Sequence, residues 1–389
     1  MREAETDSDS IIVVGSSTHF LSGVSYYTHR LALALAERHR VGVVLMRKLI
    51  PRFLYPGRDR VGADITDLSY PEGIPVVDGI DWYGGFGLLR AMLLIARMRP
   101  RTVILQWWTG AVLHSYILLA LWARLFRAAI IVEFHEVQDT GEAMVFGVAR
   151  YVDLASRLLM STISGAVLHS ESDRQPINDR FGIGHVPCAI ITHGPFDNYG
   201  ASEALRDAPP NVVNLLFFGT IRPYKGLEDL VEAFNDLDSA EVDGFWLTVV
   251  GETWEGWTGP IELIERSPHR DRITLVNRYL TDEEVGGFLA GADAVVLPYR
   301  RSSASGPLHV AMSAGLPVIV TETGGLPEAA AGYAGAIWVP PADPAAIRTA
   351  LRDLPGMVGR RFDDPSSWAA TAEKYDELIA RMDPTRASS

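Results

Sequence analysis

The stretch VVNLLFFGTIRPYKG, residues 212–226, joins an apolar run to a turn that carries two cations between glycines. The run Val212–Phe218 predicts a buried strand, and the amphipathic segment after the turn predicts a helix. Gly219 lets the chain turn sharply, and Arg222 and Lys225 place their charges where the free amides of the helix also attract anions. The stretch therefore predicts a phosphate-binding loop on a strand–turn–helix unit of an α/β domain.

The same order of strand, loop and helix recurs near residue 300. The run Ala294–Leu297 predicts a strand, and SGPLHVAMSAG, residues 305–315, predicts a loop that leads into a helix. Backbone amides at Ser305 and Gly306 are expected to contact an anion at the start of this helix. Pro307 removes one amide but favours the first turn of a helix. The chain therefore repeats one ligand-binding design within the same domain.

Strands and helices alternate along the whole chain, which indicates parallel sheets covered by helices on both faces. The segment Arg206–Asn211, with its paired prolines, is typical of a linker. We therefore predict an α/β fold of two Rossmann-like, doubly wound parallel-sheet domains, at residues 1–205 and 209–362. The amphipathic segment within residues 365–385 is expected to pack back on the first domain. The expected strands are Ile11–Val14, Val41–Met46, Thr102–Gln106 and Ile130–Phe134, then Val212–Phe218, Phe245–Val250, Ile273–Val276, Ala294–Leu297 and Val318–Thr321.

Composition limits the class of protein. The net charge of −13 argues against nucleic acid as a partner. The one cysteine, Cys188, excludes an internal disulfide and fits a reducing compartment, so we expect a cytoplasmic protein. The acidic first residues do not read as a secretory signal, and the longest apolar stretch, residues 111–126, is too short to span a membrane. The basic and apolar segment from Arg47 to Arg60 is either a solvated loop or a peripheral contact with the inner face of a membrane.

Two further candidates lie at the ends of predicted strands, where open α/β sheets bind ligands. His135 follows the strand that ends at Phe134, and Gly23 precedes the first long helix. His135, Glu136 and Asp139 are metal ligands by residue type. No second histidine stands at the spacing of a metal-binding helix and no cysteine is near, so no metal site is expected.

Together these features resemble the retaining glycosyltransferases of family four, which have the GT-B fold of two Rossmann-like domains facing across a cleft. The resemblance covers nearly the whole chain and is strongest over residues 215–329. It is carried by Ser22, Gly23 and Val24 ahead of the first helix, by Gly219, Ile221, Lys225 and Gly226 in the cation loop, and by Gly324, Gly325 and Glu328. Thr220 stands at the family's arginine, and Arg222 is its expected substitute.

The resemblance implies transfer of a sugar from a nucleoside-diphosphate sugar to a hydroxyl acceptor, with retention, without a metal and without a separate cofactor. The second domain would hold the nucleotide and the first the acceptor. Lys225 and Arg222 would stabilise the leaving diphosphate, and His135 would lie near the donor sugar. The other donor-binding positions are Gly23, Gly219, Thr220, Gly226, Tyr299, Ser305, Gly306, Pro307, Leu308 and Glu328. For Tyr299, stacking on a nucleobase and packing in the core are both open.

One departure from the family concerns its pair of glutamates. Aligning on Ala311–Gly315 puts Ser302 and Val310 at their positions. The family's glutamates contact the donor sugar and the ribose, so sugar choice and ribose binding stay open, whereas the phosphate contacts remain. Two alternatives are therefore kept. One is a non-catalytic nucleotide-sugar-binding partner. The other is a sugar-nucleotide 2-epimerase, which needs more acidic and basic side chains in its cleft than this sequence offers.

Overall fold

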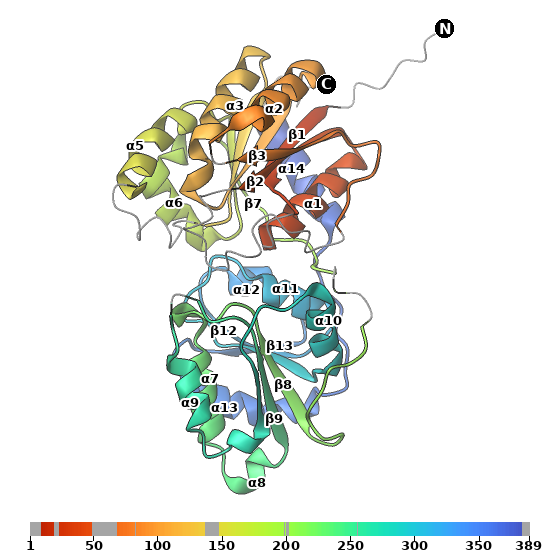
Figure 1. Ribbon diagram of the computed structural model, residues 1–389, viewed down its shortest axis with the longest axis vertical. Coiled ribbons are helices and arrows are strands. Elements are labelled where there is room, and N and C mark those ends of the chain that lie inside the picture. The colour runs from red at the N-terminus through yellow and green to blue at the C-terminus, as the bar shows by residue number, and fades with distance from the viewer. Residues whose placement is uncertain are drawn as a thin grey trace. The chain divides into compact units, whose positions relative to one another are not determined.

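The computed structural model describes residues 9–18, 23–48, 68–81, 83–136, 148–197, 199, 202–254 and 256–382. The chain forms two compact units, one of Met1–Gly194 with Trp368–Ser389 and one of Pro195–Ser367 (Figure 1). Each unit has its own parallel sheet and hydrophobic core. The predicted α/β fold of two Rossmann-like domains is confirmed.

The first unit contains a seven-stranded parallel sheet. Its strands are β1 (Ser10–Ser16), β2 (Arg40–Lys48), β3 (Val76–Asp81), β4 (Thr102–Trp107), β5 (Ala129–Phe134), β6 (Gly165–Leu168) and β7 (Cys188–Ile190). Its α-helices are α1 (Gly23–Ala36), α2 (Gly85–Met98), α3 (Leu113–Leu125), α5 (Val148–Met160), α6 (Arg174–Phe181) and α14 (Trp368–Met382). The strand order is β3-β2-β1-β4-β5-β6-β7.

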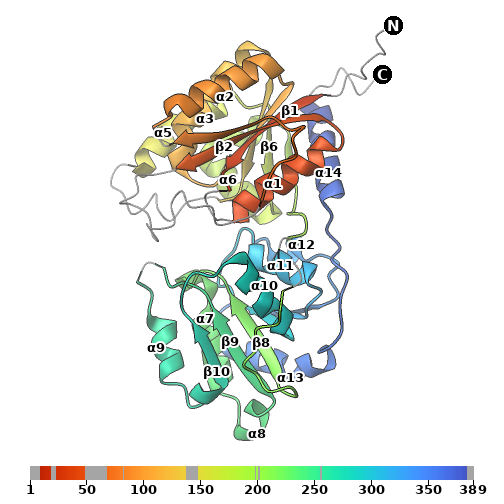
Figure 2. The ribbon, with the colours of Figure 1, turned by 45° about the vertical axis from the view of Figure 1, so that its right-hand side comes forward.

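Helices cover this sheet in two groups. The last helix of the chain, α14, packs on α1, whereas α2, α3, α5 and α6 pack on one another in sequence (Figure 2). Because both faces are covered, the central strand β1 needs apolar side chains on both sides. Its run Ile11–Val14 is fully buried, as are most residues of β4 and β5.

The second unit repeats the design with six parallel strands in the order β10-β9-β8-β11-β12-β13. The strands are β8 (Val213–Phe218), β9 (Phe245–Val250), β10 (Ile273–Val276), β11 (Ala294–Leu297), β12 (Val318–Thr321) and β13 (Ala336–Val339). The α-helices are α7 (Leu227–Asn235), α8 (Ser239–Val242), α9 (Gly259–Glu265), α10 (Asp282–Gly291), α11 (Gly306–Ser313), α12 (Leu326–Ala329) and α13 (Pro344–Asp353). The order reverses between β8 and β11, and ligands of open sheets bind beside such a reversal.

The boundary between the units lies after Gly194, not in the predicted linker Arg206–Asn211. The reason is that Arg206 is fixed to the second unit. Its guanidinium donates to the Gly291 carbonyl oxygen at 2.7 Å and pairs with the Asp293 carboxylate at 2.9 Å. Residues 195–205, which were predicted to end the first domain, therefore belong to the second unit.

Candidate functional site

Loops at the carboxyl ends of the second sheet approach one another closely. Gly219, which follows β8, has a φ of 117°, a conformation that residues with a Cβ rarely adopt. A Cβ on Gly251, which follows β9, would lie 1.8 Å from the Gly219 carbonyl oxygen. A Cβ on Gly219 would lie 3.6 Å from the Pro307 ring in α11. The glycines thus let the loops after β8 and β9 and the start of α11 meet where the strand order reverses.

Lys225 is held at this point by aromatic rings. It ends the short 3-10 helix η6 (Pro223–Lys225) and is only 8% exposed. Its Nζ lies 3.8 Å from the ring centroid of Tyr299 and 5.3 Å from that of Tyr224. Aromatic faces attract cations, so the two rings fix the position of the ammonium group.

Tyr299 supports the site from the core. It is fully buried, so the interpretation that its ring stacks on a nucleobase is wrong, and the alternative of core packing is correct. Burial raises the pKa of its hydroxyl. That hydroxyl accepts a hydrogen bond from Ser305 Oγ at 3.4 Å, and the Tyr299 carbonyl accepts one from Thr321 at 2.6 Å. Tyr299 therefore acts on the site through Lys225.

The second predicted cation, Arg222, lies against the loop after β9. Its guanidinium carbon is 4.6 Å from the ring centroid of Trp254. The backbone holds the two loops together, because Ile221 N–H donates to the Glu252 carbonyl at 2.9 Å and Trp254 N–H donates to the Ile221 carbonyl at 3.1 Å. Arg222 and Lys225 thus stand on one short loop, each beside aromatic side chains.

At the start of α11, a side chain of the chain itself takes up one of the helix amides. Ser305 caps the helix, and its Oγ accepts the Leu308 N–H at 3.2 Å. Pro307 has no N–H. Of Gly306, Pro307 and Leu308, only Gly306 therefore has an amide hydrogen to offer an anion.

At the start of α7, carboxylates occupy the first turn of the helix. Gly226 has a φ of 64°, and a Cβ there would lie 2.0 Å from the Pro298 carbonyl oxygen. The first turn carries Glu228 and Asp229. Asp229 accepts two hydrogen bonds from the Arg300 guanidinium, at 2.7 and 2.9 Å. These acids compensate the positive end of α7, so Lys225 and Arg222 are the stronger anion ligands of this loop.

The two positions aligned with the family's glutamates lie in different environments. Val310 is buried inside α11, whereas Ser302 is partly exposed and donates to the Ala304 carbonyl at 2.9 Å. Glu328 is half-buried in α12. The loop before α12 packs on the Ser302 backbone, because a Cβ on Gly324 would lie 1.7 Å from the Ser302 carbonyl oxygen.

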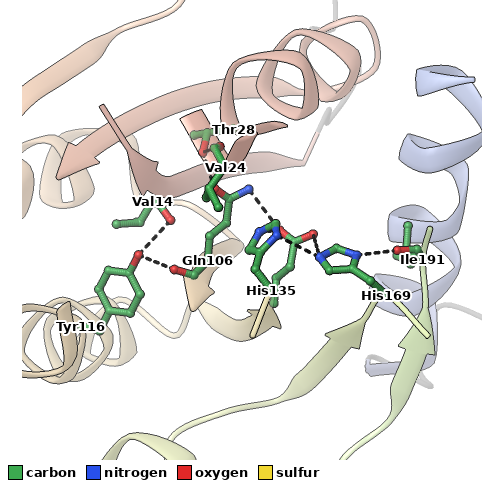
Figure 3. Close-up of polar contacts among 9 residues, drawn as sticks. Val14, Val24, Thr28, Gln106, Tyr116, His135, His169 and Ile191 are labelled. Atoms are coloured by element: carbon green, nitrogen blue, oxygen red, sulfur yellow. Dashed lines mark hydrogen bonds and ion pairs between the residues drawn. The ribbon is translucent and has the colours of Figure 1, made fainter. Parts of the chain in front are cut away.

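In the first unit, three histidines come together at the ends of neighbouring strands. His135 follows β5, His169 follows β6 and His193 comes soon after β7. All three are buried, and one ring nitrogen of each lies within 4.8 Å of the others. His169 Nδ1 donates to the Ile191 carbonyl at 2.8 Å, so the other nitrogen, Nε2, faces His135 Nδ1 at 3.1 Å (Figure 3).

Glu133, in β5, points its carboxylate at these rings. Its Oε1 is 3.8 Å from His169 Nε2, and its Oε2 is 3.8 Å from His135 Nε2. Gln106 Nε2 donates to Oε2 at 3.1 Å. Burial raises the pKa of Glu133 to about 7 and lowers the pKa of His169 to about 4. Burial and the neighbouring His169 also lower the pKa of His135, so both imidazoles are neutral at neutral pH.

Sequence reasoning found His135 but missed His169, His193 and Glu133. The sequence pattern did not show the order of the strands in the sheet. Each histidine follows a strand, but β6 and β7 were not predicted, so nothing placed the three on neighbouring strands. The contact of His135 with a donor sugar stays a prediction, and the residue is 6% exposed.

Some predicted residues lie at or beyond the edge of the described chain. Gly23 is the exposed first residue of α1, and Ser22 before it lies outside the described residues. Asp139 and most of the segment from Arg47 to Arg60 also lie outside them. Among the described residues, no helix has both the length and the hydropathy needed to cross a membrane.

Comparisons with known proteins agree with this architecture. Residues 213–355 match the family described as glycosyl transferases group 1. The D-inositol 3-phosphate glycosyltransferase of Streptomyces bingchenggensis is 28% identical over 62% of this chain and 57% of its own length. The match thus spans little more than half of that relative. The glycogen synthase of Mycobacterium tuberculosis is 25% identical over 89% of this chain and 84% of its own length.

A solved structure extends the likeness to the whole chain. The catalytic domain of starch synthase IV from Arabidopsis thaliana, bound to ADP and acarbose, aligns with a TM-score of 0.67 at 14% identity. The alignment covers 96% of this chain and 99% of that one. These relatives and this structural neighbour are all glycosyltransferases. The chain therefore has the GT-B fold, and its second unit matches the group 1 glycosyltransferases.

Proposed function

We propose that this protein is a glycosyltransferase that moves a sugar from a nucleoside-diphosphate sugar to a hydroxyl acceptor, with retention and without a metal ion at the diphosphate. The names of the relatives support sugar transfer. The ADP bound to starch synthase IV supports a nucleoside diphosphate in a fold of this type. The acceptor is a glycan, a lipid-linked sugar or a small natural product.

One observation carries the proposal. The Lys225 ammonium is held 3.8 Å from the Tyr299 ring centroid, beside the reversal of strand order in the second sheet. Arg222 stands on the same loop, against Trp254. Two cations whose positions are fixed by neighbouring rings form an anion site that needs little rearrangement when a diphosphate binds.

In this proposal the loop stabilises the leaving group. Negative charge grows on the diphosphate as its bond to the anomeric carbon breaks, and Lys225, Arg222 and the Gly306 N–H lower the energy of that charge. The acceptor hydroxyl attacks from the face that the leaving group departs, and the leaving phosphate oxygen takes the hydroxyl proton. The new bond therefore has the configuration of the old one. Because Ser302 and Val310 supply no carboxylate, binding of the donor depends mainly on its diphosphate.

The test is release of nucleoside diphosphate from a panel of donor sugars, with and without candidate acceptors. Release that depends on an acceptor, with one new glycosidic linkage in the product, supports the proposal. Binding of a nucleotide sugar without release from any donor would favour the non-catalytic alternative. Conversion of the donor into its 2-epimer would favour the sugar-nucleotide 2-epimerase.

We further propose an anionic lipid surface as a partner of the first unit. The basic segment of the sequence analysis lies mostly outside the described residues, but α2, α3 and α5 support a membrane contact of their own. Each of these neighbouring helices exposes three large apolar side chains, spaced i, i+3, i+7. They are Phe86, Leu89 and Leu93 on α2, Leu118, Leu121 and Leu125 on α3, and Tyr151, Leu154 and Leu158 on α5.

The charge on the face formed by α2, α3 and α5 suits contact with anionic lipid. Residues 83–127 and 148–160 contain one acidic residue, Asp153. Their exposed arginines are Arg90, Arg97, Arg99, Arg101, Arg124, Arg127, Arg150 and Arg157. Exposed apolar side chains together with exposed arginines, in a chain of net charge −13, are typical of an interfacial membrane contact. The same arginines would repel one another across a symmetric dimer of this face.

Cosedimentation with vesicles tests this contact. Binding to phosphatidylcholine vesicles that contain phosphatidylglycerol, but not to pure phosphatidylcholine, is expected. The variant Phe86→Ser with Leu125→Ser should lose it, whereas Leu205→Ser, an exposed leucine of the second unit, should not. Equal binding by all variants, or a dimer in light scattering that the double variant abolishes, would contradict the lipid partner.

A further inference from the structure

We propose that His135, His169 and His193 bind one divalent transition-metal ion of the zinc class, with the Glu133 carboxylate as a fourth ligand. The site lies wholly in the first unit and is separate from the cation loop of the second. Metal binding at these residues can be measured without the transfer reaction.

The donor set suits such an ion. Three imidazoles and one carboxylate are ligands that zinc and its neighbours accept, usually in a tetrahedron. Metal–nitrogen bonds of zinc sites put the ligand atoms of a tetrahedron about 3.3 Å apart. Here His135 Nδ1 and His169 Nε2 are 3.1 Å apart, and Glu133 Oε1 is 3.8 Å from His169 Nε2. A ring nitrogen of His193 lies within 4.8 Å, so small side-chain rotations complete the set.

Polar atoms converge here without ordinary hydrogen bonds. Among the described residues, His135 Nε2, Glu133 Oε1 and the hydroxyls of Tyr27 and Tyr375 are buried and have no hydrogen-bond partner. The tyrosine hydroxyls approach the Glu133 carboxylate and lower its pKa. Each buried polar atom without a partner costs about 1–3 kcal/mol. A bound ion would give the Glu133 Oε1 atom a partner.

The ligands are also oriented as metal ligands are. A ligating histidine almost always donates its second ring N–H to an oxygen. His169 does so, because its Nδ1 donates to the Ile191 carbonyl at 2.8 Å. Glu133 is held by Gln106 at 3.1 Å, and the Gln106 carbonyl accepts from the Tyr116 hydroxyl at 2.7 Å (Figure 3).

Aromatic side chains shield the cluster. The ring centroid of Tyr27 lies 4.9 Å from that of His135, 5.5 Å from that of His169 and 4.6 Å from that of His193. The Trp368 ring packs on Tyr27 at 5.3 Å. Neutral imidazoles in such an apolar enclosure keep their lone pairs available, and one ion would tie the ends of β5, β6 and β7 together.

Metal content tests the proposal without any assay of activity. The full chain is purified without a polyhistidine tag, analysed by plasma mass spectrometry, stripped with a chelator and titrated with Zn²⁺ and Co²⁺. One ion per chain is expected, and His169→Ala and His193→Asn should each lose it. His29→Ala is the matched control, because His29 is a buried histidine of the same unit that contacts the Ser69 carbonyl instead.

A cysteine variant keeps the test decisive if the other variants fold poorly. His193→Cys retains a ligand, so it should bind Co²⁺ and gain a thiolate-to-cobalt charge-transfer band that the wild type lacks. The proposal is overturned if the wild type binds no more metal than His193→Asn, or if His193→Cys binds Co²⁺ without that band. Lys225→Met is expected to lose transfer activity and to keep its metal. That result tests the proposed function and leaves the proposed metal site unaffected.

Discussion

Replacing Lys225 by methionine tests the cation loop with little change in packing. The two side chains have similar length, and Lys225 is 8% exposed, so the variant removes a charge and leaves most of the buried volume filled. Two unit charges about 4 Å apart interact by about 4 kcal/mol at an effective dielectric of 20, and loss of one preorganised donor typically lowers kcat by about 10²- to 10³-fold. We expect a fall in kcat of about 10²-fold or more. Stability should change little, because the lost cation–π contact with Tyr299 is offset by removal of a buried ammonium.

The assay is acceptor-dependent release of nucleoside diphosphate at saturating donor, with thermal unfolding measured in parallel. Lys374→Met is the matched control, because it removes the same charge from an exposed position on α14 and should leave kcat unchanged. A folded Lys225→Met enzyme whose kcat stays within about threefold of wild type would remove this loop from the reaction.

Other consequences can be measured on the same protein. Val310→Glu buries an unpaired carboxylate and should lower the free energy of unfolding by about 3 kcal/mol, whereas Ser302→Glu, at a partly exposed position, should change it by less than about 1 kcal/mol in urea unfolding. Thr281→Ala removes the cap on the Glu284 N–H and should cost about 1 kcal/mol in the same measurement. Hydrogen bonds from Arg278 and then from Thr281 lower the pKa of Glu284 from 4.5 to about 2, so the stability that this carboxylate contributes is present above pH 4.5 and is lost as the pH falls towards 2; Glu284→Gln should lose this part of the pH dependence. Adding Mg²⁺ or Mn²⁺ to protein treated with chelating resin should not raise the initial rate, and a strict requirement for either ion would contradict metal-free stabilisation of the diphosphate.

Most of the fold could be predicted because its signals are local. Runs such as Ile11–Val14 and Val318–Thr321 are apolar throughout, as strands buried on both faces must be, and they lie in β1 and β12. Thr281 and Glu284 have the sequence spacing of a capping box, and both hydrogen bonds of that box are present at the start of α10. The linker was misplaced because the contacts that fix Arg206 to the second unit join residues far apart in sequence.

The candidate site was harder to predict for the same reason. Glycine spacing placed Lys225 and Arg222 on one loop, but only the fold shows that Tyr299 is a buried support for Lys225. The histidine cluster was missed because β6 begins with glycine and alanine and β7 is only three residues long, so neither has the run of large apolar residues that predicted β12. Three histidines that are far apart in sequence become neighbours only when the strands before them are placed side by side.

The most direct test of the central claim is calorimetry of nucleoside diphosphate, monophosphate and nucleoside binding to wild type and Lys225→Met. If the cations at the reversal of strand order recognise the diphosphate, the diphosphate should bind wild type at least about tenfold more tightly than the nucleoside. Lys225→Met should lose most of that difference while its affinity for the nucleoside stays the same. Equal affinity of wild type for all three ligands, or an undiminished preference for the diphosphate in Lys225→Met, would contradict the account.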